Sequence, residues 1–143
     1  MPDVYHNFPI KKSPSKVYEN ITGSKGLDNW WTKSSGSNPE LGGKYSLYFG
    51  PGYNWKALVT KFESDQVFEL QFTEADEDWL GTKVGFVLAA KDGKTAVNFY
   101  HSGWPQANDH FKISSFCWAM YLRILKRNTE LGEQVPYEKR PDV

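Results

Sequence analysis

The chain has 143 residues, and its 17 Lys and Arg balance its 17 Asp and Glu, so the formal net charge at pH 7 is zero. Phe, Tyr and Trp make up 16% of the sequence. This charge-balanced, aromatic-rich composition excludes intrinsic disorder and lacks the basic excess with which nucleic-acid-binding proteins contact phosphates. Apolar runs such as Phe86–Ala90 are far shorter than the roughly 20 residues of a membrane-spanning helix.

The N-terminus and the cysteine content bear on the compartment. The first residues do not show the charged segment and apolar stretch of a secretory signal peptide. Cys117 is the only cysteine, which forbids an internal disulfide and is typical of a reducing compartment. With no linker or repeat in the sequence, we expect a soluble cytoplasmic protein that folds as a single domain over residues 1–143.

The beginning of the chain predicts one strand and two short helices. Residues 4–10 alternate loosely between apolar and polar side chains, as in a strand. Ser13 and Pro14 then suit the N-cap and the first position of a helix. A second short helix is predicted over 27–31, and the Ser-, Gly- and Asn-rich stretch 32–39 predicts a loop.

The middle of the chain, residues 42–103, predicts about five consecutive antiparallel strands. Apolar and polar side chains alternate over 44–49, 68–73 and 84–90, as on strands with one buried face. The Asp92-Gly93 dipeptide is a strong signal for a tight hairpin turn. Strands joined by short turns in this way form an antiparallel meander.

A long C-terminal helix is predicted after this sheet. Asn108 or Asp109 can cap its start, and Gly132 is suited to its end. The tail from Gln134 contains two prolines and is expected to be loose. Side chains spaced four, three, four and three residues apart are expected to form its buried stripe: Phe111, Ser115, Trp118, Leu122 and Leu125.

This order of elements predicts an α+β fold, in which the long helix covers one face of a curved antiparallel sheet. A strongly curved sheet does not pack flush along the whole length of a helix, so pockets arise between the two layers. Aromatic side chains suit the walls of such a pocket because they supply large, rigid apolar area.

Five segments in this order resemble the START-like, Bet v 1-type superfamily (SRPBCC), and within it the branch named for the activator of the Hsp90 ATPase. The similarity covers roughly residues 4 to 133. The segments are Ser13–Tyr18, Gly26–Trp31, Leu41–Tyr45, Thr95–Trp104 and Trp118–Gly132.

The resemblance implies a helix-grip (Bet v 1-like) fold. In that fold a curved antiparallel sheet wraps around a long C-terminal helix, two short helices lie between the first and second strands, and a cavity lies between sheet and helix. Co-chaperone activity is not implied, because the name comes from a larger eukaryotic protein with an additional N-terminal domain. The acidic loop 74–78 departs from the pattern of the branch without affecting the fold.

The first functional hypothesis is a binding module for a small apolar or amphipathic molecule, with no cofactor. Any one of the residues expected on the inner faces is best read as core packing, whereas the set as a whole favours a cavity. The expected cavity residues are Trp31, Tyr45, Leu47, Phe72, Phe86, Leu88, Phe99, His101, Phe111, Trp118, Tyr121 and Leu122.

The rival hypothesis is an enzyme of the cyclase or hydrolase kind. It needs polar groups that converge inside the cavity, and the candidates are His101, Tyr45, Tyr121 and Glu69. The alternative for His101 is a structural histidine, because no carboxylate partner is identifiable from its spacing. Glu69 is also expected, with Glu63, to be a solvent-facing charge on the outer side of the sheet.

A third hypothesis is a protein-interaction module that acts on a chaperone or regulator. It predicts an exposed apolar patch with Tyr48, Tyr53 and Trp79 as members. Metal binding is not expected, because the three histidines are scattered and no Cys/His cluster has ligand spacing. Cys117, flanked by Phe and Trp, is expected to be a buried small apolar residue rather than a nucleophile.

Overall fold

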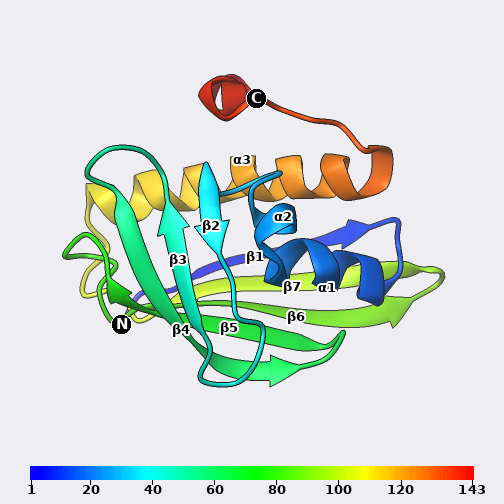
Figure 1. The fold of residues 1–143 in the computed structure, drawn as a ribbon, viewed down its shortest axis with the longest axis horizontal. Coiled ribbons are helices and arrows are strands. Elements are labelled where there is room, and N and C mark those ends of the chain that lie inside the picture. The colour runs from blue at the N-terminus through cyan, green and yellow to red at the C-terminus, as the bar shows by residue number, and fades with distance from the viewer.

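The computed structural model describes all of residues 1–143 and shows a seven-stranded antiparallel sheet that curves around one long helix (Figure 1). The strands lie in the order β1-β7-β6-β5-β4-β3-β2, so the first strand pairs with the last. The elements are β1 (Val4–Ile10), α1 (Pro14–Thr22), α2 (Ser24–Leu27), β2 (Ser34–Gly36), β3 (Lys44–Tyr48), β4 (Asn54–Glu63), β5 (Val67–Glu74), β6 (Lys83–Lys91), β7 (Lys94–Ser102), α3 (Asp109–Leu131) and the 3-10 helix η1 (Tyr137–Asp142).

The predicted fold class is confirmed: the curved sheet wraps around α3, and α1 and α2 come between β1 and β2 in the sequence (Figure 1). Two local predictions are wrong. The second helix, α2, ends at Leu27 instead of beginning there. The stretch 32–39 contains β2, which pairs with β3 so that Gly36 lies opposite Ser46. This short strand depends on its neighbour, a contact that local composition does not encode.

The ends of the two longer helices follow their predicted capping residues. The Ser13 side chain accepts a hydrogen bond from the backbone N–H of Lys16 at 3.3 Å, and Asn108 accepts one from Phe111 at 3.0 Å. Gly132 ends α3 in the left-handed region, with φ of 69°. No helix combines the length and the apolar character needed to cross a membrane.

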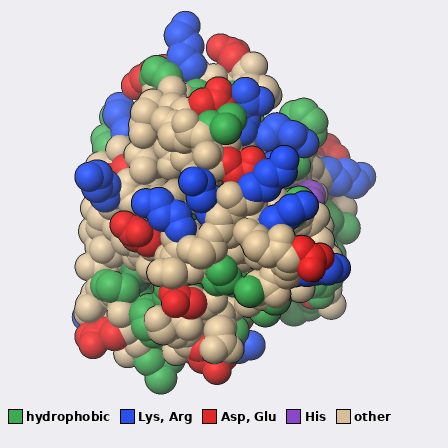
Figure 2. All heavy atoms as spheres, turned by 90° about the vertical axis from the view of Figure 1, so that its right-hand side faces the viewer, with side chains coloured by type: hydrophobic (Ala, Val, Ile, Leu, Met, Phe, Trp, Pro, Cys, Tyr) green, Lys and Arg blue, Asp and Glu red, His purple; other side chains and the backbone are tan.

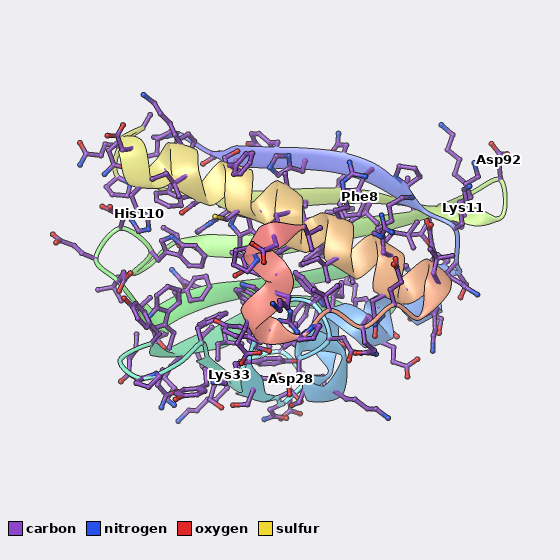
Figure 3. All side chains as sticks on the ribbon, turned by 90° about the horizontal axis from the view of Figure 1, so that it is seen from above. Phe8, Lys11, Asp28, Lys33, Asp92 and His110 are labelled. Atoms are coloured by element: carbon purple, nitrogen blue, oxygen red, sulfur yellow. The ribbon has the colours of Figure 1, made fainter.

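The C-terminal tail, expected to be loose, is held in place by η1 and by a buried arginine. The side chain of Arg140 is only 4% exposed, and its guanidinium donates to the carbonyl oxygens of Thr32 at 3.1 Å and Asp28 at 2.7 Å. The Tyr137 hydroxyl donates to the carbonyl of Phe49 at 2.8 Å. Seen from above, η1 crosses the middle of α3 (Figure 3). The tail therefore becomes a wall of the site described below.

The core lies between the inner face of the sheet and α3, and Trp118 stands at its centre. The ring centroid of Trp118 is 4.6 Å from that of Phe99, 5.2 Å from that of Trp31 and 5.9 Å from that of Trp79. Such tilted and offset contacts between aromatic rings are the arrangements that their quadrupoles favour. The core aromatics therefore form one continuous packed network that reaches from β7 to α3.

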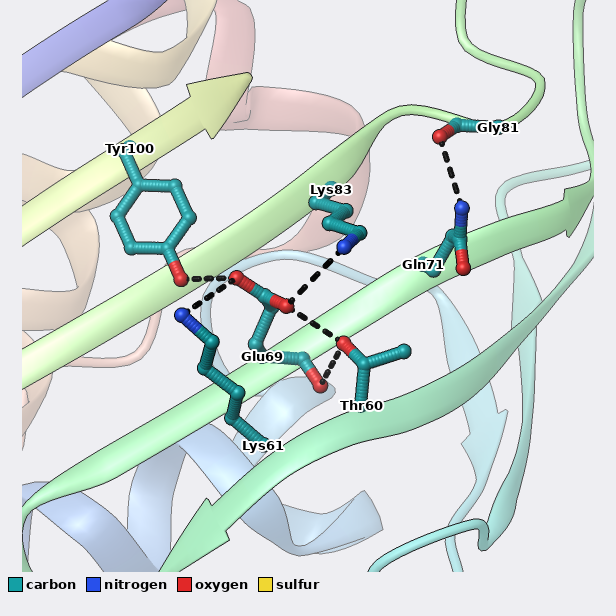
Figure 4. Close-up of polar contacts among 7 residues, drawn as sticks. All are labelled: Thr60, Lys61, Glu69, Gln71, Gly81, Lys83 and Tyr100. Atoms are coloured by element: carbon teal, nitrogen blue, oxygen red, sulfur yellow. Dashed lines mark hydrogen bonds and ion pairs between the residues drawn. The ribbon is translucent and has the colours of Figure 1, made fainter. Parts of the chain in front are cut away.

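A buried carboxylate lies on the outer face of the sheet, the face turned away from the helices (Figure 4). Glu69 is 3% exposed, which corrects the expectation that it faces solvent. One of its oxygens accepts a hydrogen bond from the Thr60 hydroxyl at 2.7 Å, and the other accepts one from the Tyr100 hydroxyl. The ammonium groups of Lys61 and Lys83 lie 3.8 and 3.9 Å from the carboxylate. These donors and charges compensate its burial.

Gly85 makes this arrangement possible. It lies on β6 directly between Tyr100 of β7 and Glu69 of β5 in the strand register. Because Gly85 has no side chain, the Tyr100 ring can pass close over it. Figure 4 shows the Tyr100 hydroxyl reaching Glu69. A Cβ atom at position 85 would stand 2.1 Å from the Cζ atom of Tyr100, far inside contact distance.

We predict that Gly85→Ala destabilises the protein by about 1–3 kcal/mol, the usual cost of overpacking. The same substitution made in a Tyr100→Ala background should cost almost nothing, since the clashing ring is gone. Urea unfolding of the four proteins of this cycle measures both values. An equal penalty for Gly85→Ala in the two backgrounds would contradict the steric explanation.

Candidate ligand-binding pocket

A half-open pocket of about 250 Å³ lies between α3, the β3–β4 end of the sheet and η1. An engineered apolar cavity of about 150 Å³ holds one benzene molecule, so this pocket has room for about two fused rings. Nine of its eleven lining residues are hydrophobic. The lining residues are Trp31, Phe49, Trp55, Trp79, His110, Ile113, Ser114, Cys117, Trp118, Tyr121 and Tyr137.

One wall of the pocket is a continuous set of aromatic rings. Trp31 follows α2, Phe49 follows β3, Trp55 lies on β4, and Trp79 lies in the loop between β5 and β6. The ring centroids of Trp31 and Phe49 are 5.5 Å apart, those of Phe49 and Trp55 are 5.2 Å apart, and those of Trp55 and Trp79 are 5.0 Å apart. Since each ring supports the next, the wall is preformed.

The opposite wall is formed by α3, and one stripe of this helix carries side chains with polar atoms. His110, Ser114, Cys117 and Tyr121 follow at steps of four, three and four residues, which places them on one face of the helix. No protein group forms a hydrogen bond with the hydroxyls of Ser114 and Tyr121. Burial raises the pKa of Tyr121 to about 12, so its hydroxyl stays protonated at neutral pH. Both hydroxyls are therefore available to a ligand.

His110 connects the mouth of the pocket to the acidic loop 74–78. Its Nδ1 atom lies 3.0 Å from the carboxylate of Asp78, which also accepts a hydrogen bond from Asn108 at 3.2 Å. The hydrogen bonds from His110 and Asn108 hold the pKa of Asp78 below its usual value. This part of the loop, expected to be only a solvated charge run, thus fixes the start of α3 beside the pocket.

Of the twelve residues predicted for the cavity, the structure brings three to the pocket: Trp31, Trp118 and Tyr121. The other nine pack in the core or against it and do not line the pocket: Tyr45, Leu47, Phe72, Phe86, Leu88, Phe99, His101, Phe111 and Leu122.

Sequence reasoning missed most of the aromatic wall. Trp55 lies on a strand with apolar residues on both faces, so its direction could not be assigned from alternation. Trp79, expected in an exposed patch, is buried in the wall, and this placement corrects the patch proposed with Tyr48 and Tyr53. Tyr137 lies in the tail, which was expected to be loose but is anchored by Arg140 and by the Tyr137 hydroxyl.

His101 is a completely buried link in a chain of hydrogen bonds, away from the pocket mouth. The indole N–H of Trp118 donates to its Nδ1 atom at 3.0 Å, and its Nε2 atom lies 2.8 Å from the Thr82 hydroxyl. That hydroxyl in turn donates to the carbonyl of Trp79 at 2.5 Å. Since Nδ1 accepts, the proton of the neutral ring is on Nε2. Burial is the main cause that lowers the pKa of His101 to about 3.

The four polar residues of the enzyme hypothesis do not converge. Glu69 lies on the outer face of the sheet, and His101 is enclosed in the core. The Tyr45 hydroxyl donates to the carbonyl of Thr22 at the other side of the core. Only Tyr121 lines the pocket. This geometry gives the enzyme hypothesis no assembled acid–base site.

We predict that His101 makes the protein acid-sensitive. Its pKa is lower in the folded state than the ordinary 6.5 of an unfolded chain, so its contribution is complete above pH 6.5 and is lost as the pH falls toward 3. The loss amounts to about 1.4 kcal/mol per pH unit. Urea unfolding between pH 6 and 4.5 should give a steeper loss of stability for the wild type than for His101→Gln. Equal slopes would contradict a neutral buried histidine.

Comparisons with known proteins agree with this architecture. The family model described as "Activator of Hsp90 ATPase homolog 1-like protein" matches residues 11–130. The solution structure of the Aha1 dimer from Colwellia psychrerythraea is 30% identical, with a TM-score of 0.84 over 93% of this chain and 99% of that chain.

Two further solved structures share the fold at lower identity. A Staphylococcus saprophyticus protein is 15% identical, with a TM-score of 0.79 over 94% of this chain and 96% of its own. A Bacillus halodurans protein is 22% identical, with a TM-score of 0.76 over 91% and 98%. A search of curated proteins found no match. The family model covers most of the length of this chain. The chain therefore belongs to the Activator of Hsp90 ATPase homolog 1-like family, within the START-like, Bet v 1-type superfamily.

Proposed function

We propose that this protein binds a small, planar, largely apolar molecule in the pocket between α3 and the aromatic wall. The observation that carries the proposal is a concave pocket of about 250 Å³ in which nine of the eleven lining residues are hydrophobic. Concave, mostly apolar sites with a few polar groups are where proteins usually bind small molecules. Here the space is bounded by rings that are already in place.

The two walls indicate the shape and polarity of the ligand. Flat rings fit against Trp31, Trp55 and Trp79, where stacking and burial of apolar area supply the affinity. The hydroxyls of Ser114 and Tyr121 point to hydrogen-bonding groups along the opposite edge of the ligand. An amphipathic bicyclic aromatic molecule satisfies both walls.

We predict that 2-naphthol binds in this pocket, and the six tryptophans provide the readout. Trp31, Trp55, Trp79 and Trp118 line the pocket, whereas Trp30 and Trp104 are buried elsewhere in the core. On titration, the indole N–H resonances of the four lining residues should shift in ¹H–¹⁵N spectra, and the other two should stay nearly fixed. Saturation without any shift of the four would contradict binding at this site.

A matched pair of variants tests whether the pocket itself holds the ligand. Cys117→Phe places a ring inside the pocket and should weaken 2-naphthol binding at least tenfold. Lys112→Phe adds the same ring to the same helix at an exposed position that does not line the pocket, and it should leave binding unchanged. Calorimetric titration measures both. Equal binding by the two variants would place the ligand elsewhere.

We also propose that two copies of the chain associate. The solved relative from Colwellia psychrerythraea is titled a dimer. A specific observation on this chain favours association: Phe116, on the outer side of α3, is 79% exposed, and the nearby Ile113, which also lines the pocket, is 60% exposed. Large apolar side chains that lie together at a surface are typical of an interaction site.

A further inference from the structure

The outer face of α3 carries a line of three exposed residues of different character. Asp109, Phe116 and Arg123 are spaced seven residues apart, which is close to two turns, so they lie along nearly one line on the helix. The order along the helix is acidic, aromatic, basic. Neither Asp109 nor Arg123 forms an ion pair within the chain, whose salt bridges involve other residues.

From this line we infer that two copies associate through antiparallel α3 helices, related by a two-fold axis at Phe116. The inference rests on the proposed association and names its surface. In an antiparallel pair the order of one copy meets the reverse order of the other. Asp109 then faces the partner's Arg123, Arg123 faces the partner's Asp109, and the two Phe116 rings meet at the axis. A two-fold interface requires this kind of self-complementarity.

The same residues exclude the parallel arrangement. A parallel pair would place Asp109 against Asp109 and Arg123 against Arg123, and like charges in contact are unfavourable. The antiparallel pair also sets Ile113 opposite Ala119, whose small side chain lets the two helices approach closely. Charge and size therefore both select the antiparallel orientation.

The required surface is open in the single chain. Asp109, Phe116 and Arg123 are all exposed. Seen from above, η1 crosses α3 near its middle, and no other element passes over the N-terminal half of the helix (Figure 3). Figure 2 shows Lys and Arg side chains on the face of the molecule that lies on the right in Figure 1, where α3 ends. One helix from each copy makes a small interface, so the dimer should dissociate on dilution.

Charge reversal provides the test, by sedimentation velocity over a range of protein concentrations. Each two-fold pair contains the Asp109–Arg123 contact twice. Asp109→Arg alone or Arg123→Asp alone therefore creates two repulsive contacts and should raise the dimer dissociation constant at least tenfold. The double variant restores both contacts, and its dissociation constant should return to within a few-fold of the wild-type value.

Mixing the two single variants gives a second, independent readout. Each variant alone has like charges across the axis, but one copy of each offers two matched pairs. An equimolar mixture should therefore form mixed dimers at concentrations where either variant alone is monomeric. Glu40→Arg and Lys44→Asp change exposed charges at the opposite edge of the sheet and should not alter association. Circular dichroism melts verify that each variant is folded.

The outcomes separate the two proposals. A wild-type protein that remains monomeric at every concentration overturns both the association and its surface. A wild-type dimer that neither single variant weakens overturns the α3 surface and leaves the association standing. Weakening by both single variants, with no recovery in the double variant or in the mixture, overturns the antiparallel pairing.

Discussion

The hydrogen bond from the Trp118 indole to His101 is the interaction on which both the core and the pocket depend. Trp118 packs against rings from the sheet on one side and forms part of the pocket on the other. The buried N–H of Trp118 donates to His101, and the imidazole can accept this hydrogen bond only in its neutral form. The neutral state of His101 is thus a structural requirement: protonation would remove the acceptor and place a positive charge in an aromatic core.

The pocket exists because the sheet and the helix diverge where the tail returns. Along most of α3, the inner side chains of the strands fill the space against the helix, as expected for a close-packed interior. At the β3–β4 end, the chain closes the gap with η1 instead of with more core side chains. Arg140 binds the carbonyls of the segment after α2 and thereby fixes Tyr137 as the outer wall.

The sequence allowed the fold to be predicted more completely than the site. Strand alternation, the Asn108 cap and Gly132 are local signals, and the structure confirms them. Trp118 was placed on an inner face by the helical periodicity, and Trp31 and Tyr121 were expected in the same cavity. Periodicity tells which face a residue occupies, however, and not how far along a curved sheet the gap to the helix opens. For that reason Phe99 and Phe72 fill the core, while residues from loops and the tail line the pocket.

Helix α3 presents three different faces, and their separation explains how one element can serve three purposes. Trp118, Leu122 and Leu125 face the sheet and stabilise the fold. The stripe that includes Ser114 and Tyr121 faces the pocket, and the line through Phe116 faces solvent. A helix spreads successive residues around its axis by about 100°, so neighbours in sequence lie on different faces. A polar group in the pocket and a charge on the outer line can therefore change independently, without altering the apolar face that holds the helix in the sheet.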